Sequence, residues 1–155
     1  MKKIAVVIPA CNEEAYIERC LKALKSARLY FFQHVGKLAV LPEIKILVVL
    51  DSCTDSTASK VQQSGIQTIS CHFKNVGKAR HLGVQHMIEQ GCDWICCTDA
   101  DSFVQRDWFQ VMLQHQPADV ICGVVDLDEW GHLSTLARQT YLSHYQDKMD
   151  HRHIH

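Results

Sequence analysis

Two carboxylates separated by one residue, Asp99 and Asp101, are the side chains of this sequence best suited to bind a hard cation. They directly follow an apolar run, Trp94 to Thr98, and carboxylate oxygens are preferred ligands of Mg²⁺ and Mn²⁺. A cation held in this way keeps positions open for diphosphate oxygens and offsets the charge of a departing phosphate group. We therefore predict that Asp99 and Asp101 bind Mg²⁺ or Mn²⁺. The alternative is a pair of solvated loop acids, or a cap of the following helix.

A third acid, Asp51, follows the apolar run that ends at Leu50. Its carboxylate can accept hydrogen bonds from a nucleobase N–H group or from ribose hydroxyls, so we assign it to nucleoside recognition. The neighbouring Thr54 and Asp55 are good N-cap residues, and we interpret them as helix caps outside the site.

The segment from Asn75 to Arg80 combines a flexible glycine with two cations, Lys78 and Arg80, at a predicted helix start. The exposed N–H groups of a helix start attract anions, so this segment is a candidate diphosphate site. An ordinary solvated helix start is an equally good interpretation. The sequence contains neither G-x-x-x-x-G-K-[ST] nor G-x-G-x-x-G, which argues against a Walker-type nucleotidase and a nicotinamide-dependent dehydrogenase.

The sequence ends in alternating histidines, His151, His153 and His155. An extended segment would place all three on one face, where a neutral imidazole, with His155 as the candidate, can join the metal ligands. We favour the alternative of a frayed, solvated terminus.

Short apolar runs alternate with helical patterns along the sequence. The runs predict strands, of which the first is broken by Pro9: Ile4–Ile8, Ile44–Leu50, Ile66–Cys71, Trp94–Thr98 and Val120–Val125. Apolar residues at helical spacing, with caps and terminating glycines, predict five helices. The first is capped by Asn12 and reaches Leu24, the second ends at Gly65, and the third is Lys78–Gln90. The fourth has Trp108, Val111, Met112 and His115 on a single face, and the last is marked by Leu133, Leu136, Ala137 and Tyr141. The stretch from Leu29 to Pro42 is less regular.

This alternation predicts an α/β fold with a mostly parallel sheet and helices on both faces. In such folds ligands bind at the carboxyl ends of the strands. The acids at Glu13, Asp51, Asp99 and Asp101 each follow a predicted strand, so they should meet at one edge of the sheet.

Composition indicates one globular domain covering residues 1–155. The 16 basic and 17 acidic side chains give a formal charge of -1, which excludes a general field for nucleic acid or anionic membranes. No apolar run is long enough for a transmembrane segment or a signal peptide, so we predict a cytoplasmic protein. The eight cysteines are interpreted as reduced thiols, because neither a disulfide framework nor a paired zinc motif is evident.

Four segments together resemble the family-2 glycosyltransferases, which have a Rossmann-like GT-A fold. They are Val6-Val7-Ile8-Pro9-Ala10-Cys11-Asn12-Glu13-Glu14, Val48-Val49-Leu50-Asp51-Ser52-Cys53-Thr54-Asp55-Ser56-Thr57, Asn75-Val76-Gly77-Lys78-Ala79-Arg80 and Thr98-Asp99-Ala100-Asp101-Ser102. Their order and spacing both agree with the family, and the resemblance runs from about residue 4 to the end of the sequence.

The resemblance implies that the loop from Pro9 to Glu13 and Asp51 line a nucleoside pocket, that Arg80 lies near the nucleotide, and that Asp101 is the principal metal-binding acid, with Asp99 nearer the ribose and metal. The predicted residues for binding a nucleoside-diphosphate sugar are Pro9, Ala10, Asn12, Glu13, Asp51, Lys78, Arg80, Asp99 and Ala100. The implied reaction transfers the sugar to an acceptor hydroxyl, which the sequence does not identify.

Members of this family continue past the segment resembled by His151 to His155, through a portion that supplies the catalytic base. Between Asp107 and Asp150 no acid matches that role, and Asp126 and Asp128 are interpreted as loop acids. We therefore expect a domain that is incomplete at its C-terminus, with surface available for self-association. A non-catalytic module that binds a sugar nucleotide is the main alternative. A sugar-phosphate nucleotidyltransferase ranks third, because its glycine-rich loop is absent.

Overall fold

The computed structural model of the chain describes residues 3–36, 41–115, 118–126 and 134–150. Its contacts divide the chain into two compact units, Met1–Asp119 and Val120–His155. The predicted ligand His155, like His151 and His153, lies outside the described residues. Within them, no helix has the combination of length and hydrophobicity that crossing a bilayer requires.

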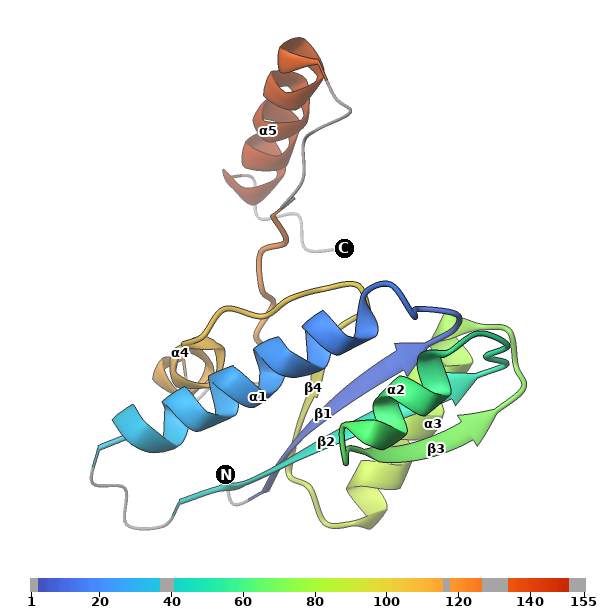
Figure 1. Cartoon of the computed structure of the whole chain (residues 1–155). Coiled ribbons are helices and arrows are strands. Elements are labelled where there is room, and N and C mark those ends of the chain that lie inside the picture. The colour runs from blue at the N-terminus through green and yellow to red at the C-terminus, as the bar shows by residue number, and fades with distance from the viewer. Residues whose placement is uncertain (1–2, 37–40, 116–117, 127–133, 151–155) are drawn as a thin grey trace. The chain divides into compact units, whose positions relative to one another are not determined.

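The first unit contains a sheet of four parallel strands in the order β3-β2-β1-β4 (Figure 1). The strands are β1 (Lys3–Ala10), β2 (Glu43–Asp51), β3 (Gln67–Cys71) and β4 (Trp94–Cys97). Val7 in the central strand pairs with Leu47 of β2 on one side and with Cys97 of β4 on the other. Continuous burial of β1 and β2 explains their apolar sequences, since both faces of these strands are covered.

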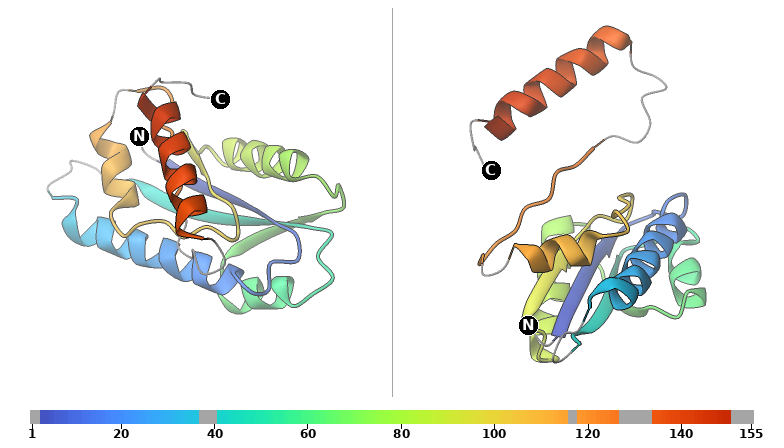
Figure 2. Two further views of the ribbon diagram at one scale, coloured as in Figure 1. Left: turned by 90° about the horizontal axis from the view of Figure 1, so that it is seen from above. Right: turned by 90° about the vertical axis from the view of Figure 1, so that its left-hand side faces the viewer.

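Helices cover both faces of this sheet. Figure 2 shows α1 (Ile17–His34), α2 (Thr57–Gln63) and α4 (Trp108–Gln114) on one face and α3 (Val76–Glu89) on the other. The α3 face is packed by Val7 and Val49 of the sheet against Ala79 and Met87 of the helix. On the opposite face, the buried rings of Phe31 and Phe109 join α1 to α4 with their centroids 6.2 Å apart. The predicted α/β fold with a parallel sheet is confirmed.

Gly83 lies where α3 packs tightly against the sheet. A Cβ atom added there would lie 2.5 Å from Cγ1 of Val7 and 2.7 Å from Cγ2 of Val49. Glycine is therefore required by the packing at this position, where any side chain would overlap the sheet. This contact fixes how far α3 stands from β1 and β2.

The break predicted at Pro9 is wrong, because β1 continues to Ala10. The carbonyls of Lys3 and Val7 accept hydrogen bonds on the β4 side, from the N–H groups of Asp93 and Thr98. Pro9, two residues beyond Val7, faces the same side but lies past the end of the β4 pairing. The strand tolerates a residue without an N–H group at this point.

The predicted limits of the first helix are also wrong. The helix begins at Ile17 with Tyr16 as its N-cap, because Asn12 has a left-handed backbone with φ of 57° and a side chain that contacts another loop. It also runs on to His34 through the stretch predicted to be irregular. Burial of Phe31, seven residues after Leu24, extends its apolar stripe and explains the added turns.

In the second unit, the strand predicted at Val120–Val125 is wrong. The described residues there form no strand, and Val120 is 76% exposed. The run is apolar but has no partner strand among the residues described, and an apolar run alone does not make a strand. The predicted last helix is confirmed as α5 (Thr135–Asp150), although Leu136 is 73% exposed.

Candidate functional site

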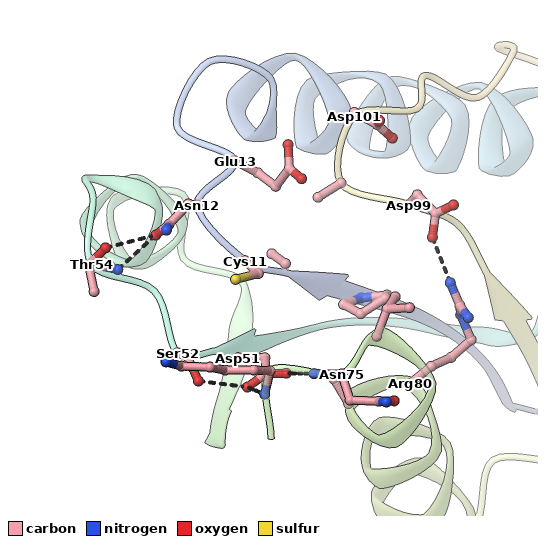
Figure 3. Close-up of a pocket in the computed structure, with 16 residues that line it drawn as sticks. Cys11, Asn12, Glu13, Asp51, Ser52, Thr54, Asn75, Arg80, Asp99 and Asp101 are labelled. Atoms are coloured by element: carbon pink, nitrogen blue, oxygen red, sulfur yellow. Dashed lines mark hydrogen bonds and ion pairs between the residues drawn. The ribbon is translucent and has the colours of Figure 1, made fainter. Parts of the chain in front are cut away.

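A cavity of about 710 Å³ opens at the carboxyl ends of β1, β2 and β4 (Figure 3). It lies where the strand order reverses between β1 and β4, the position at which doubly wound sheets bind ligands. The predicted site residues that line it are Pro9, Ala10, Asn12, Glu13, Asp51, Arg80, Asp99, Ala100 and Asp101. The predicted residue Lys78 instead lines a separate depression along α3, with Phe73 and His81. This volume is of the size that binds small molecules and cofactors.

Each of the first three strands is followed by a residue with positive φ that is not glycine. The φ angles are 57° at Asn12, 56° at Ser52 and 48° at Lys74, and all three residues line the cavity. For residues other than glycine, a left-handed backbone costs roughly 1–2 kcal/mol, and less for asparagine. Contacts elsewhere must therefore hold these three reversals in place.

Asn12 joins the first loop to the second. Its side-chain oxygen accepts hydrogen bonds from the Thr54 N–H group at 2.8 Å, the Thr54 hydroxyl at 3.3 Å and the Asp55 N–H group at 3.4 Å. The Glu13 N–H group donates to the Thr57 hydroxyl at 2.7 Å, which adds a second link between these loops. The side-chain oxygen of Asn12 thus holds the first and second loops together at the cavity wall. Asp55 accepts from the Thr57 N–H group at 2.9 Å, but the N-cap of α2 is Ser56, so the predicted N-caps at Thr54 and Asp55 are wrong.

Asp51 joins the second loop to the third and is only 3% exposed. Its Oδ1 accepts from the N–H groups of Phe73 at 2.8 Å and Lys74 at 3.0 Å, and from the Ser52 hydroxyl at 3.0 Å. Its Oδ2 accepts from the Asn75 N–H group at 2.9 Å. Since a carboxylate has about four acceptor positions, only Oδ2 has one left for a ligand.

These hydrogen bonds also keep the Asp51 carboxylate charged. Burial by itself raises the pKa of Asp51, but the hydrogen bonds, led by those from the Asn75 and Lys74 N–H groups, outweigh burial and lower the pKa to about 2. Asp51 is therefore an anion that holds the third loop against the second, and it presents its remaining acceptor position to the cavity.

The third loop leads into α3 and places Arg80 beside the cavity. Asn75 is the N-cap of α3, since its side-chain oxygen accepts from the Lys78 N–H group at 2.9 Å. From the second turn of this helix, Arg80 extends its Nη2 atom to within 2.7 Å of Asp99 Oδ1 (Figure 3). The ion pair links α3 to the loop that follows β4.

The opposite wall of the cavity carries Glu13, Asp99 and Asp101. Burial raises the pKa of Glu13, and the charges of Asp101, Asp55 and Asp99 raise it further. This wall is thus strongly negative and attracts cations. No three histidine, cysteine, aspartate or glutamate side chains in the described part of the chain form a complete metal-binding group. Magnesium, however, is commonly held by one or two carboxylates together with substrate phosphates and water, and Asp99 and Asp101 fit that arrangement.

The loop bearing these acids is fixed on α1. The Asp99 carbonyl accepts from the Cys20 thiol at 3.6 Å, and Ala100 is buried. Further along, the Arg19 guanidinium lies 3.8 Å from the centre of the Phe103 ring, while that of Arg106 lies 4.9 Å from the ring of Tyr30. The backbone around Asp99 and Asp101 is consequently held by α1 on one side and by β4 on the other.

Residues 5–153 match the model of the family described as glycosyl transferase family 2. The chain belongs to this family. A search of the curated proteins finds no match for this family-2 glycosyltransferase.

Several solved structures resemble this family-2 glycosyltransferase. The S. aureus TarS 1-349 structure is 19% identical, with a TM-score of 0.51, and the match covers 74% of this chain and 32% of TarS 1-349. The same TarS fragment in complex with UDP is 18% identical at a TM-score of 0.51, covering 74% and 31% of the two chains. Glucosyl-3-phosphoglycerate synthase from Mycobacterium tuberculosis, in complex with Mn²⁺, UDP-glucose and phosphoglyceric acid, is 28% identical at a TM-score of 0.33, covering 44% and 21%. The predicted GT-A fold is confirmed, and this chain spans about a third of the length of the TarS fragment.

The cavity also contains residues that the sequence analysis missed. Ser52 and Lys74 line it although neither was assigned to the site, and so does Thr54, which was wrongly interpreted as a helix cap outside the site. Lys74 follows the third strand, and parallel strands bring all their carboxyl ends to one edge, so its place after β3 was the signal for it.

Proposed function

We propose that this family-2 glycosyltransferase binds a nucleoside-diphosphate sugar together with Mg²⁺ or Mn²⁺ and transfers the sugar to an acceptor hydroxyl. The observation that carries the proposal is the cavity at the strand-order reversal, which combines the Asp99 and Asp101 carboxylates with the Arg80 cation. A diphosphate and a divalent cation together need both kinds of charge side by side. Family membership supports the same chemistry.

The chain's own residues divide this task. Asp51 accepts a hydrogen bond from the nucleoside through its remaining Oδ2 position, and Arg80 balances the diphosphate charge. Asp101 and Asp99 would hold the cation, which when bound acts as a Lewis acid for the leaving diphosphate. In the transfer, the acceptor oxygen forms a bond to the anomeric carbon while the bond from that carbon to the diphosphate oxygen breaks, its electron pair leaves with the diphosphate, and the proton of the acceptor hydroxyl passes to solvent water.

A second function, donor binding without transfer, is favoured by one observation. The carboxylates that line the described cavity are Glu13, Asp51, Asp99 and Asp101. Asp51 is saturated by loop contacts except for one position, Asp99 and Asp101 are assigned to the cation, and Glu13 belongs to the loop assigned to the nucleoside, so no lining carboxylate is assigned to the acceptor proton. Transfer of sugar, or slow hydrolysis of a sugar nucleotide, by the isolated chain would contradict this alternative.

Replacing Asp101 with asparagine is the test of the proposed donor site. Calorimetric binding of UDP, GDP and dTDP, with and without Mn²⁺, should show one nucleotide bound in a metal-dependent way. In Asp101→Asn this affinity should fall by more than about tenfold, because even indirect partners of metal ligands contribute that much. Asp119→Asn, which removes an exposed acid outside the cavity, is the matched control. Equal metal-dependent binding by Asp101→Asn and by the control would remove the assignment.

A further inference from the structure

The ion pair between Arg80 and Asp99 joins the two groups that the ligands of this cavity need. We infer that this pair is a charge switch that opens most favourably when a divalent cation and a diphosphate bind together, so that each ligand promotes binding of the other. The inference rests on the proposed function, because it assumes that these two kinds of ligand share the cavity. In the empty site, Asp99 and Arg80 act as counter-ions of each other.

The backbone on each side of the pair is fixed, so the switch involves side chains alone. On α3, the Asn75 cap and the Asn75 contact with Asp51 set the position of Arg80. On the other side, the Cys20 thiol holds the Asp99 carbonyl. The two charged side chains remain partly solvated, with 35% of Arg80 and 60% of Asp99 exposed. They can therefore separate without unfolding a loop.

The pair is weak enough for ligands to open. Partly exposed ion pairs contribute about 1 kcal/mol or less to stability, because water solvates both charges once they part. A diphosphate carries more negative charge than one carboxylate, and a divalent cation more positive charge than one guanidinium. Exchange of Asp99 for diphosphate at Arg80, and of Arg80 for the cation at Asp99, strengthens both attractions.

When only one ligand is bound, either Arg80 or Asp99 is released beside a charge of its own sign. A cation bound at Asp99 faces the released Arg80 guanidinium, which has the same sign. A diphosphate bound at Arg80 faces the released Asp99 carboxylate, next to Asp101 and Glu13. When both ligands bind, each charge has an opposite neighbour, so the coupling between the two ligands is favourable and reciprocal.

Asp101 differs from Asp99 in this respect. It forms no ion pair within the described part of the chain, and its Oδ1 accepts only a long hydrogen bond, 3.4 Å, from the Ser102 hydroxyl. Asp101 is thus available to a cation at all times, whereas Asp99 becomes available only when Arg80 leaves it.

The test measures each ligand separately on the full chain, with Mn²⁺ alone as one probe and inorganic pyrophosphate in the presence of a chelator as the other. Arg80→Gln should bind Mn²⁺ up to about fivefold more tightly than the wild type, because the competing cation is gone. Asp99→Asn should bind pyrophosphate more tightly by a similar factor. Both variants should gain affinity for their ligand. Removal of a residue that only supports ligand binding would instead lower the affinity.

Two controls accompany these variants. Arg80→Lys keeps a cation at the position and should leave Mn²⁺ affinity near the wild-type value, while Lys22→Gln removes a positive charge from an exposed position on α1. Unchanged or weaker Mn²⁺ binding by Arg80→Gln, together with unchanged or weaker pyrophosphate binding by Asp99→Asn, would overturn the switch and leave the proposed function standing. Failure of the wild-type chain to bind a nucleotide and Mn²⁺ together would overturn both.

Discussion

Asp51→Asn lowers the free energy of unfolding by about 3 kcal/mol at neutral pH, because charge-assisted hydrogen bonds become neutral and a part-buried N–H group loses its acceptor. An asparagine can place its oxygen toward Phe73 and Lys74, but its NH₂ group then meets the Asn75 N–H group, and two donors repel. Loss of the Asn75 contact also loosens the start of α3, so we expect nucleotide affinity to fall as well.

The effect of this substitution depends on pH in a defined direction. The pKa of Asp51 is about 2 in the folded chain, below its usual value of 3.8. Above pH 3.8 the carboxylate is charged in both states, and its stabilising contribution is complete. As the pH falls from about 3.8 towards 2, the unfolded chain binds the proton first, and the contribution of Asp51 is progressively lost.

Urea unfolding of the wild type and Asp51→Asn at pH 7, 4 and 3 provides the measurement. The difference between the two proteins should shrink between pH 4 and 3. Asp93→Asn is a suitable control, because Asp93 is exposed and accepts from the Lys3 N–H group at 2.8 Å. A difference that stays constant from pH 7 to pH 3 would show that the charge of Asp51 does not contribute to stability.

Gly83→Ala is expected to destabilise the first unit by about 1–3 kcal/mol, even though alanine is the better helix former. The added methyl group would overlap Val7 and Val49, at 2.5 Å and 2.7 Å, and both belong to the rigid centre of the sheet. Relief requires α3 to move outward, which would draw Arg80 away from Asp99. We therefore expect weaker nucleotide binding together with lower stability.

Gly77→Ala is the matched control on the same helix. A Cβ at Gly77 would meet only the Asn75 Oδ1 atom, at 3.3 Å, which belongs to a side chain that can shift. Thermal unfolding of both variants should show a clear loss for Gly83→Ala and a change within about 0.5 kcal/mol for Gly77→Ala. Equal stability of the two variants would mean that α3 can move away from the sheet at little cost.

Most of the sheet and its helices could be predicted from local sequence. Apolar runs such as Ile44–Leu50 are buried on both faces of the sheet. A continuous apolar sequence is typical of strands buried in this way, so it predicts them. The run at Val120–Val125 is also mostly apolar but has no partner strand among the described residues. Pairing depends on distant residues, so composition alone could not separate these two cases.

The position of Asp99 and Asp101 at the cavity could be predicted from the sequence, because a single strand end determines it. Positions that depend on contacts between loops were not predictable. The backbone hydrogen bonds of Asp51 come from a loop that starts more than 20 positions later, and Asn12 was taken for a cap because its contact with Thr54 lies 42 positions away in the sequence. Lys78 and Arg80 could have been separated, since residues two apart on a helix point about 200° from each other and cannot both face one cavity.

The left-handed residues at Asn12, Ser52 and Lys74 limit how this cavity can change during evolution. Backbone reversals held by hydrogen bonds between loops set its outline, while neighbouring side chains such as Cys11 and Val76 line it. Under the proposed function, mutations at these neighbours can alter which sugar nucleotide is preferred without changing the shape of the cavity. Changes at the three reversals are confined to the few residue types that tolerate a positive φ, so variation in ligand preference should accumulate between them.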